Sequence, residues 1–149
     1  MGYTAFFGNL AIMDRLAEEE AKKKNLAQAA DWSSGQLRAI GLNDTEAQIA
    51  KEIEVDFTQA MKLYDKKLIE WARKYRLETQ GDMCALSPPD IDALDRERWD
   101  IAKAHVVRLQ VALGESAFKK IEQHVHDVWT PKPPLSEREK NGQKSAARK

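Results

Sequence analysis

An apolar stripe in the middle of the chain restricts its fold more than any other feature. The stripe consists of Ile49, Ile53, Phe57, Ala60, Tyr64, Leu68, Trp71 and Tyr75. Successive members are three or four residues apart, which places them on one face of an α-helix and is incompatible with one face of a strand. The spacing therefore predicts one long helix, over about residues 44–80, whose apolar face lies against other helices.

Turn and capping residues mark the ends of this helix. Gly41 follows Ile40 as expected for a helix-terminating residue in the left-handed conformation. Asn43, followed three residues later by Glu46, has the pattern of an N-cap with its reciprocal acid. We expect Gly81 to end the helix. At 1.5 Å per residue it would extend over about 50 Å, so we expect its far end to protrude from the domain or to pair with a second copy.

Other apolar stripes predict further helices on both sides. Residues 4–24 read as one helix, and residues 25–41 allow a second that is broken or loosened near 31–35. Pro88, with Ser87 as its cap, begins another helix that continues to about residue 113 along a stripe containing Ile91, Leu94, Ile101, His105 and Leu109. Gly114 interrupts it, and a last helix of about four turns ends near residue 129.

These elements predict an all-α fold, an antiparallel bundle of four or five helices with one long central helix. The bundle would occupy residues 1–130 as a single domain. Residues 131–149 form a polar, Pro-containing tail that we expect to be disordered. This tail holds six basic and two acidic residues, a net charge of +4, so the remainder carries −4 in a chain of formal charge zero.

Charge and hydropathy exclude some functions for the folded body. Its weakly acidic balance argues against nucleic-acid binding by the bundle itself. No apolar run approaches the ~20 residues of a membrane-spanning helix. The sequence contains no glycine-rich phosphate loop, nucleophile elbow, H-E-x-x-H pattern or paired-cysteine motif, and we therefore expect a protein without enzymatic activity and without a cofactor.

Three histidines are the candidates for metal or ligand binding. Glu122 and His126 are four residues apart and could share a metal ion, but His124 and His126 are only two apart and point about 200° away from each other on a helix. We interpret these two as surface histidines. His105 lies on the apolar stripe between Ile101 and Leu109, and we expect a core side chain that hydrogen-bonds a neighbouring helix.

Large aromatic residues are the candidates for interaction. The four tryptophans are Trp32, Trp71, Trp99 and Trp129. Packing within the bundle is their default role, but exposed tryptophans would mark a partner surface. Trp71 and Tyr75 stand near the far end of the long stripe, and together with Trp99 and Trp129 they are our predicted interaction residues.

Several stretches of the sequence together resemble a known group of proteins. The relevant stretches are Phe6-Phe7 with Leu10 and Asp14, the corner Gly41-Leu42 leading to Glu46 and Lys51-Glu52-Ile53, and the series Ile101, His105, Leu109, Ala112-Leu113-Gly114, Phe118 and Val125. In order and spacing they resemble a family of uncharacterised bacterial helical proteins over most of residues 3–129. Members typically carry an export signal and have no assigned activity.

A fainter likeness concerns periplasmic helical chaperones with an L-T-x-x-Q corner. The corner here reads Leu42-Asn43-Asp44-Thr45-Glu46-Ala47-Gln48, in which Thr45 and Gln48 are displaced from the pattern. The likeness is one of analogy.

These observations predict a non-enzymatic helical interaction protein that binds a protein partner or itself. It would be chaperone-like or a component of an assembly. The alternative is a bundle that binds a metal or small ligand through His105 or through His124 and His126. The family resemblance implies export with a removed leader, whereas a native start at Met1 would imply the cytoplasm.

Overall fold

The computed structural model describes residues 2–78 and 88–129, which form four helices. These are α1 (Gly2–Lys23), α2 (Trp32–Ile40), α3 (Asp44–Glu78) and α4 (Pro88–Trp129). No strand occurs within these two ranges. The predicted all-α helical bundle with one long central helix is therefore confirmed. The predictions for Gly81, for the Ser87 cap and for the tail 131–149 lie outside the described residues.

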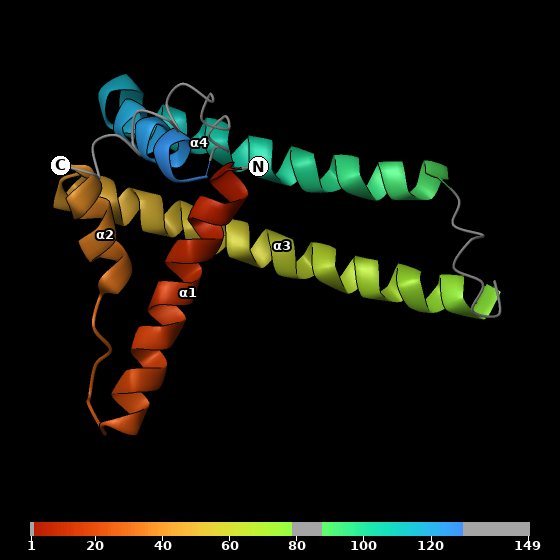
Figure 1. Cartoon of the computed structure of the whole chain (residues 1–149), viewed down its shortest axis with the longest axis horizontal. Coiled ribbons are helices and arrows are strands. Elements are labelled where there is room, and N and C mark those ends of the chain that lie inside the picture. The colour runs from red at the N-terminus through yellow and green to blue at the C-terminus, as the bar shows by residue number, and fades with distance from the viewer. Residues whose placement is uncertain (1, 79–87, 130–149) are drawn as a thin grey trace, which may run out of the picture.

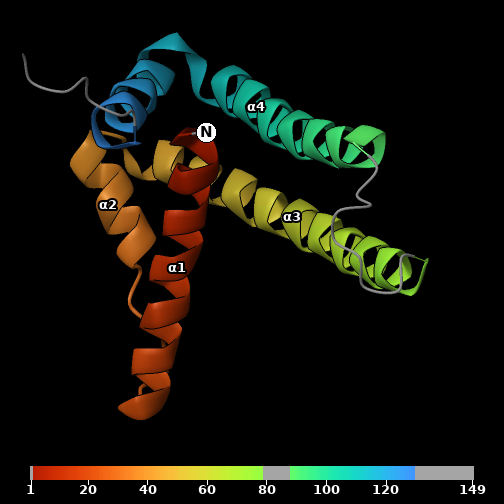
Figure 2. The same ribbon diagram turned by 45° about the vertical axis from the view of Figure 1, so that its right-hand side comes forward.

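The two long helices form a hairpin, with α3 and the first part of α4 lying side by side (Figures 1 and 2). Helix α1 crosses this hairpin near its base at a steep angle, and α2 lies alongside α1. The last part of α4 returns over the base. Among the described helices none is both long and apolar enough to cross a lipid bilayer.

The hydrophobic core lies at this crossing. All four helices contribute buried side chains, including Phe6, Phe7, Leu10, Leu37, Ala50, Ile53, Phe57, Leu109 and Ile121. The rings of Phe7 in α1 and Phe57 in α3 approach to 4.8 Å between centroids. Because α1 contributes three of the largest buried side chains, the core is concentrated where α1 covers the hairpin.

The central stripe is buried only over part of α3. Ile53, Phe57 and Tyr64 are buried, whereas Leu68 is 37% exposed and the side chains of Trp71 and Tyr75 are half-buried. The outer half of the hairpin extends beyond α1 (Figure 2). As expected from its length, the far end of α3 protrudes from the domain.

The corner between α2 and α3 has the predicted caps. Gly41 adopts the left-handed conformation with φ 103°, and its N–H donates to the carbonyl oxygen atoms of Arg38 and Leu37. The Asn43 side chain accepts a hydrogen bond from the N–H of Glu46 at 2.8 Å, and the Glu46 carboxylate accepts one from the N–H of Asn43 at 2.8 Å. This reciprocal capping box sets the first turn of α3.

The segment before α2 corrects one prediction. Residues 25–31 are not helical, although a loosened helix was expected over 25–41. Helix α2 begins at Trp32 because the Asp31 carboxylate accepts a hydrogen bond from the N–H of Ser34 at 3.2 Å and so caps it. Gly35, expected within the break, lies inside the helix.

The break in α4 occurs at Gly114, as predicted. This residue has φ 77° and ψ 171°, a conformation that is essentially restricted to glycine, and the helix axis changes direction there (Figure 2). A Cβ atom added at Gly114 would meet no atom within 4 Å, so backbone strain alone opposes another residue.

We therefore expect Gly114→Ala to lower the free energy of unfolding by about 1–3 kcal/mol. Gly35→Ala is the matched control, because a Cβ there also meets no atom within 4 Å but the residue is helical. The control should raise the free energy of unfolding by about 0.5–1 kcal/mol. Urea denaturation measures both, and equal effects of the two substitutions would contradict the strain at Gly114.

A charged junction joins α1, α2 and α3. The Lys51 ammonium lies 2.6 Å from the Asp31 carboxylate and 3.6 Å from that of Asp14. Burial alone would raise the pKa of Asp31, but hydrogen bonds from Lys51 and Ser34 and the charge of Lys51 outweigh it and lower the pKa to about 2. The folded state thus favours the ionised form of Asp31.

The lowered pKa predicts a pH dependence of stability. A carboxyl group with a depressed pKa stabilises the fold above its ordinary value near 3.8 and loses this contribution as the pH falls towards about 2. Asp31→Asn retains a cap acceptor but not the charge. We expect the difference in unfolding free energy between the native protein and this variant to shrink between about pH 4 and pH 2.

Urea titrations at a series of pH values measure this difference. Burial raises the pKa of Glu54, which gives the opposite pH dependence, but both proteins retain Glu54 and its effect cancels. A difference that does not change across this pH range would contradict the role of the Asp31 charge.

Candidate functional site

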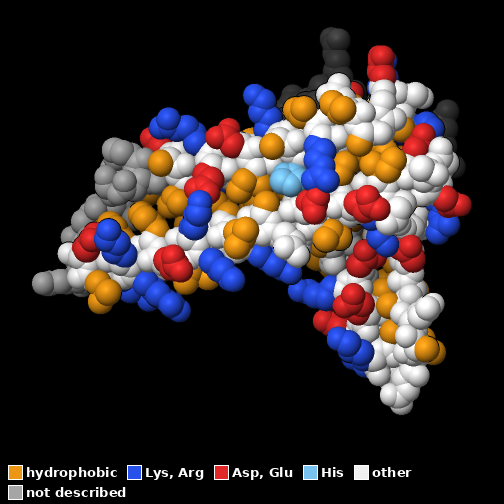
Figure 3. Space-filling view, turned by 180° about the vertical axis from the view of Figure 1, so that it is seen from behind, with side chains coloured by type: hydrophobic (Ala, Val, Ile, Leu, Met, Phe, Trp, Pro, Cys, Tyr) orange, Lys and Arg blue, Asp and Glu red, His pale blue; other side chains and the backbone are white. Residues whose placement is uncertain are grey.

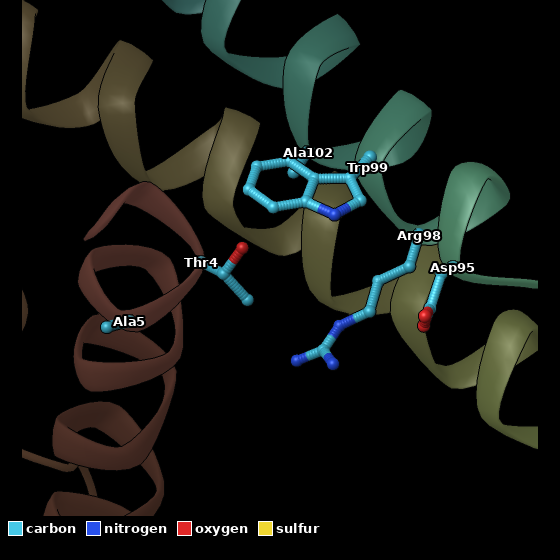
Figure 4. A pocket seen from close by; sticks show the side chains of 6 residues that line it. All are labelled: Thr4, Ala5, Asp95, Arg98, Trp99 and Ala102. Atoms are coloured by element: carbon cyan, nitrogen blue, oxygen red, sulfur yellow. The ribbon is translucent and has the colours of Figure 1, made fainter. Parts of the chain in front are cut away.

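Two hollows on one side of the hairpin join into a single groove. The hollow nearer α1 has a volume of about 410 Å³ and is lined by Thr4, Ala5, Asp95, Arg98, Trp99 and Ala102 (Figure 4). The outer hollow, of about 460 Å³, is lined by Met61, Tyr64, Asp65, Leu68, Trp71, Ile91, Leu94, Asp95 and Arg98. Because they share Asp95 and Arg98, we describe them together as the hairpin groove.

The hairpin groove is largely apolar. Leu68 on its α3 side is partly exposed, and Trp99 on its α4 side is 54% exposed. Trp71 stacks on Tyr75 one turn further along α3, with 5.4 Å between ring centroids and 16° between the ring planes. Large apolar side chains that line a solvent-accessible groove are typical of a surface that binds a partner.

Charged groups also line the hairpin groove. The side chains of Asp65, Asp95 and Arg98 make no hydrogen bond or ion pair within residues 2–78 and 88–129. All three charges act on Tyr64. The pKa of Tyr64 is raised, chiefly because burial disfavours the phenolate; Arg98 opposes this shift, and Asp95 and two other carboxylates reinforce it.

The other side of the hairpin is fastened by ion pairs. Lys67 pairs with Glu97, and Arg108 pairs with Asp56, each joining α3 to α4. Glu97 is two residues from Trp99, so the two side chains point about 200° apart on α4. Figure 3 shows the molecule from behind, with charged side chains along the hairpin and apolar side chains between them.

His105 lies on the hairpin but not in the hairpin groove. Its Nδ1 is 2.7 Å from the carbonyl oxygen of Ile101, one turn earlier in α4. Its contact with α3 is aromatic, edge-on to Phe57 with 5.5 Å between ring centroids. The expected hydrogen bond to a neighbouring helix is therefore wrong for the described residues, because the ring nitrogen of His105 is engaged by a carbonyl of its own helix.

His124 and His126 point in different directions at the end of α4. His124 lies between the rings of Phe6 and Trp129, at 6.3 and 5.4 Å between ring centroids, and its Nε2 is buried without a hydrogen-bond partner among the described residues. The interpretation of His124 as a surface histidine is therefore wrong, because the ring packs against these two aromatic side chains. The exposed His126 has its Nδ1 3.4 Å from the Asp127 carboxylate.

Glu122, the other candidate ligand, is exposed near Tyr3. Burial of the Tyr3 hydroxyl and, second, the charge of Glu122 raise the pKa of Tyr3 to about 12. Over the part of the chain that the structure describes, no three His, Cys, Asp or Glu residues gather where they could hold a metal ion.

The structure brings two of the predicted interaction residues into one groove, places a third beside them and separates the fourth. Trp71 and Trp99 line the hairpin groove, and Tyr75 stacks beyond Trp71. Trp129 instead packs edge-on against Phe6 at the base of the domain, with 5.9 Å between ring centroids. The predicted interaction residues of the hairpin groove therefore come from α3 and the first part of α4.

Sequence reasoning missed Arg98 as a groove residue. Arg98 lies four residues after Leu94 and three before Ile101, so it occupies the inward position that the second apolar stripe leaves vacant. A charged residue at such a position is the signal that could have identified it, because a guanidinium there must reach a partner or solvent.

Comparison of the chain with models of protein families, with curated proteins and with solved structures gives no match. The resemblance to exported bacterial helical proteins stays a prediction.

The exposed position of Trp99 predicts that it contributes little to stability. We expect Trp99→Ala to lower the free energy of unfolding by about 1 kcal/mol or less. Phe57→Ala, which removes a ring that is only 3% exposed, should cost about 3–5 kcal/mol. Thermal or urea denaturation compares the two variants, and a similar loss in both would mean that Trp99 belongs to the core.

Proposed function

We propose that this protein is a non-enzymatic interaction module that binds an amphipathic helix of a protein partner in the hairpin groove. The observation that carries the proposal is the apolar groove itself, which continues along α3 and α4 beyond the segment that α1 covers. A chaperone or an assembly component would use such a surface, as the sequence led us to expect.

The packing of α1 supports this mode of binding. Near the base of the hairpin, Phe6, Phe7 and Leu10 of α1 fill the space beside α3 and α4. Beyond α1 the same two helices present Leu68 and Trp71 without a third helix among the described residues, and Trp99 borders the hollow where α1 ends this groove. Full burial of a side chain of this size contributes about 1.5–3 kcal/mol, so a helix with a few apolar anchors has enough surface to bind.

The alternative of a metal- or small-ligand-binding bundle has less support. His105 and His124 make separate aromatic contacts, with Phe57 and with Phe6, and His126 faces solvent. None of these histidines lines the hairpin groove. We therefore favour the interaction module.

The proposal predicts that a helical peptide binds to the hairpin groove. The probe is an 18-residue peptide with leucines at helical i, i+3, i+4 and i+7 spacing and an uncharged polar face of glutamine and alanine. We expect saturable binding by fluorescence anisotropy, with a negative heat-capacity change by calorimetry because apolar surface is buried. Leu68→Glu should weaken binding at least tenfold, about 1.4 kcal/mol, because the docked helix would bury a charge.

Leu63→Glu is the matched control. Leu63 is 62% exposed on α3 and does not line the hairpin groove, so this variant should bind the peptide as the native protein does. Equal losses in the two variants, or no binding by the native protein at millimolar peptide, would overturn the proposal. Native mass spectrometry of the purified protein tests the other possible occupant, a second copy of the chain. A stable dimer that dissociates on Leu68→Glu would assign the groove to that second copy.

A further inference from the structure

Resting on the proposed function, we propose that the hollow nearer α1 binds a carboxylate of the docked helix. Arg98, Trp99 and Thr4 would hold it, and the partner would be an amphipathic helix with an acidic residue at the end that lies against α1. Such a site would select which partner helices bind and fix how they lie along the hairpin groove.

Three hydrogen-bond donors face the same space in this hollow. Figure 4 shows the Arg98 side chain extending from α4 towards Thr4 of α1, with the indole nitrogen of Trp99 directed into the space between them. The guanidinium and the indole N–H can only donate, and the Thr4 hydroxyl can donate as well. Such a set of donors matches an acceptor-only group, and a carboxylate is the acceptor-only side chain of proteins.

The charge of Arg98 strengthens this preference. Arg98 reaches the hairpin groove from an inward position of the α4 stripe and has no acidic partner at hydrogen-bond distance in residues 2–78 and 88–129. The same hollow is lined by the apolar side chains of Ala5, Trp99 and Ala102 and by Asp95, which lies on the side of Arg98 away from α1. A docked helix would exclude water from this site, and a charge-assisted hydrogen bond is then stronger than a neutral one.

The outer part of the hairpin groove has the opposite preference. Asp95 lies on the side of Arg98 away from α1 (Figure 4), and Asp65 borders the outer hollow on α3. An acidic residue of the partner would be repelled there, and a neutral or basic residue would be accepted. Asp95 and Arg98 line both hollows, but the hollow nearer α1 adds the donors of Thr4 and Trp99, whereas the outer hollow adds the carboxylate of Asp65. This difference gives the groove an electrostatic direction along the hairpin.

Three peptides test this direction. All share the 18-residue apolar stripe described above; one has two glutamates in its last turn, one has two glutamines there and one has two lysines. We expect the glutamate peptide to bind about tenfold more tightly than the glutamine peptide, and the lysine peptide to bind more weakly than either. The preference for glutamate should decrease as salt concentration rises.

Substitutions of Arg98 assign the preference to the hollow. Arg98→Gln should remove the difference between the glutamate and glutamine peptides, and Arg98→Glu should make the lysine peptide the tightest. Trp99→Phe, which retains an aromatic ring without the N–H donor, should reduce the preference for glutamate. Arg96→Gln is the matched control, because Arg96 lies on α4 outside the hairpin groove and should leave the preference unchanged.

The outcomes separate this inference from the proposed function. Equal affinities of the glutamate and glutamine peptides, with Leu68→Glu still weakening both, would overturn the carboxylate site and leave the interaction module intact. Binding of no peptide would overturn both. Hexanoate, a small amphipathic carboxylate, should displace the glutamate peptide only at millimolar concentration; displacement near the peptide's own dissociation constant would overturn the helical occupant.

Discussion

The crossing of α1 over the α3–α4 hairpin is the contact on which the rest of the structure depends. At its centre the ring of Phe7 packs against that of Phe57, with Phe6 and Leu10 buried beside them. This contact places the core at the base of the hairpin. Because α1 crosses at a steep angle, it covers only a short length of the two long helices, and the outer half of the hairpin has no third helix from the described residues.

The hairpin groove is a direct consequence of this arrangement. An apolar stripe that continues beyond the covering helix leaves Leu68 and Trp71 in contact with solvent, and Trp99 is exposed beside α1. The two sides of the hairpin also differ, since ion pairs such as Lys67–Glu97 fasten one side while Asp65, Asp95 and Arg98 on the other make no such pair among the described residues. A hairpin held together on one side and open on the other can receive a helix without losing its own contacts.

Local backbone chemistry explains why so many element ends could be predicted. Gly41 and Gly114 both adopt positive φ, which favours glycine, and Asn43 with Glu46 forms the capping box that the spacing indicates. The exception is the start of α2. There Asp31 acts as the cap and also pairs with Lys51, and the second interaction depends on the position of α3, which periodicity around residue 31 does not reveal.

The sequence by itself determined the long helices, the capped corner at Gly41–Asn43, the break at Gly114 and the long apolar stripe, because period, caps and glycines act over a few neighbouring residues. Only the tertiary structure decided which part of the stripe is buried, because the path of α1 depends on packing between residues far apart in the chain. The same packing joined Trp71 and Trp99 in one groove, placed Trp129 against Phe6 instead, and brought Thr4 opposite Arg98. A charged residue at an inward position was visible in the sequence, but its neighbours were not.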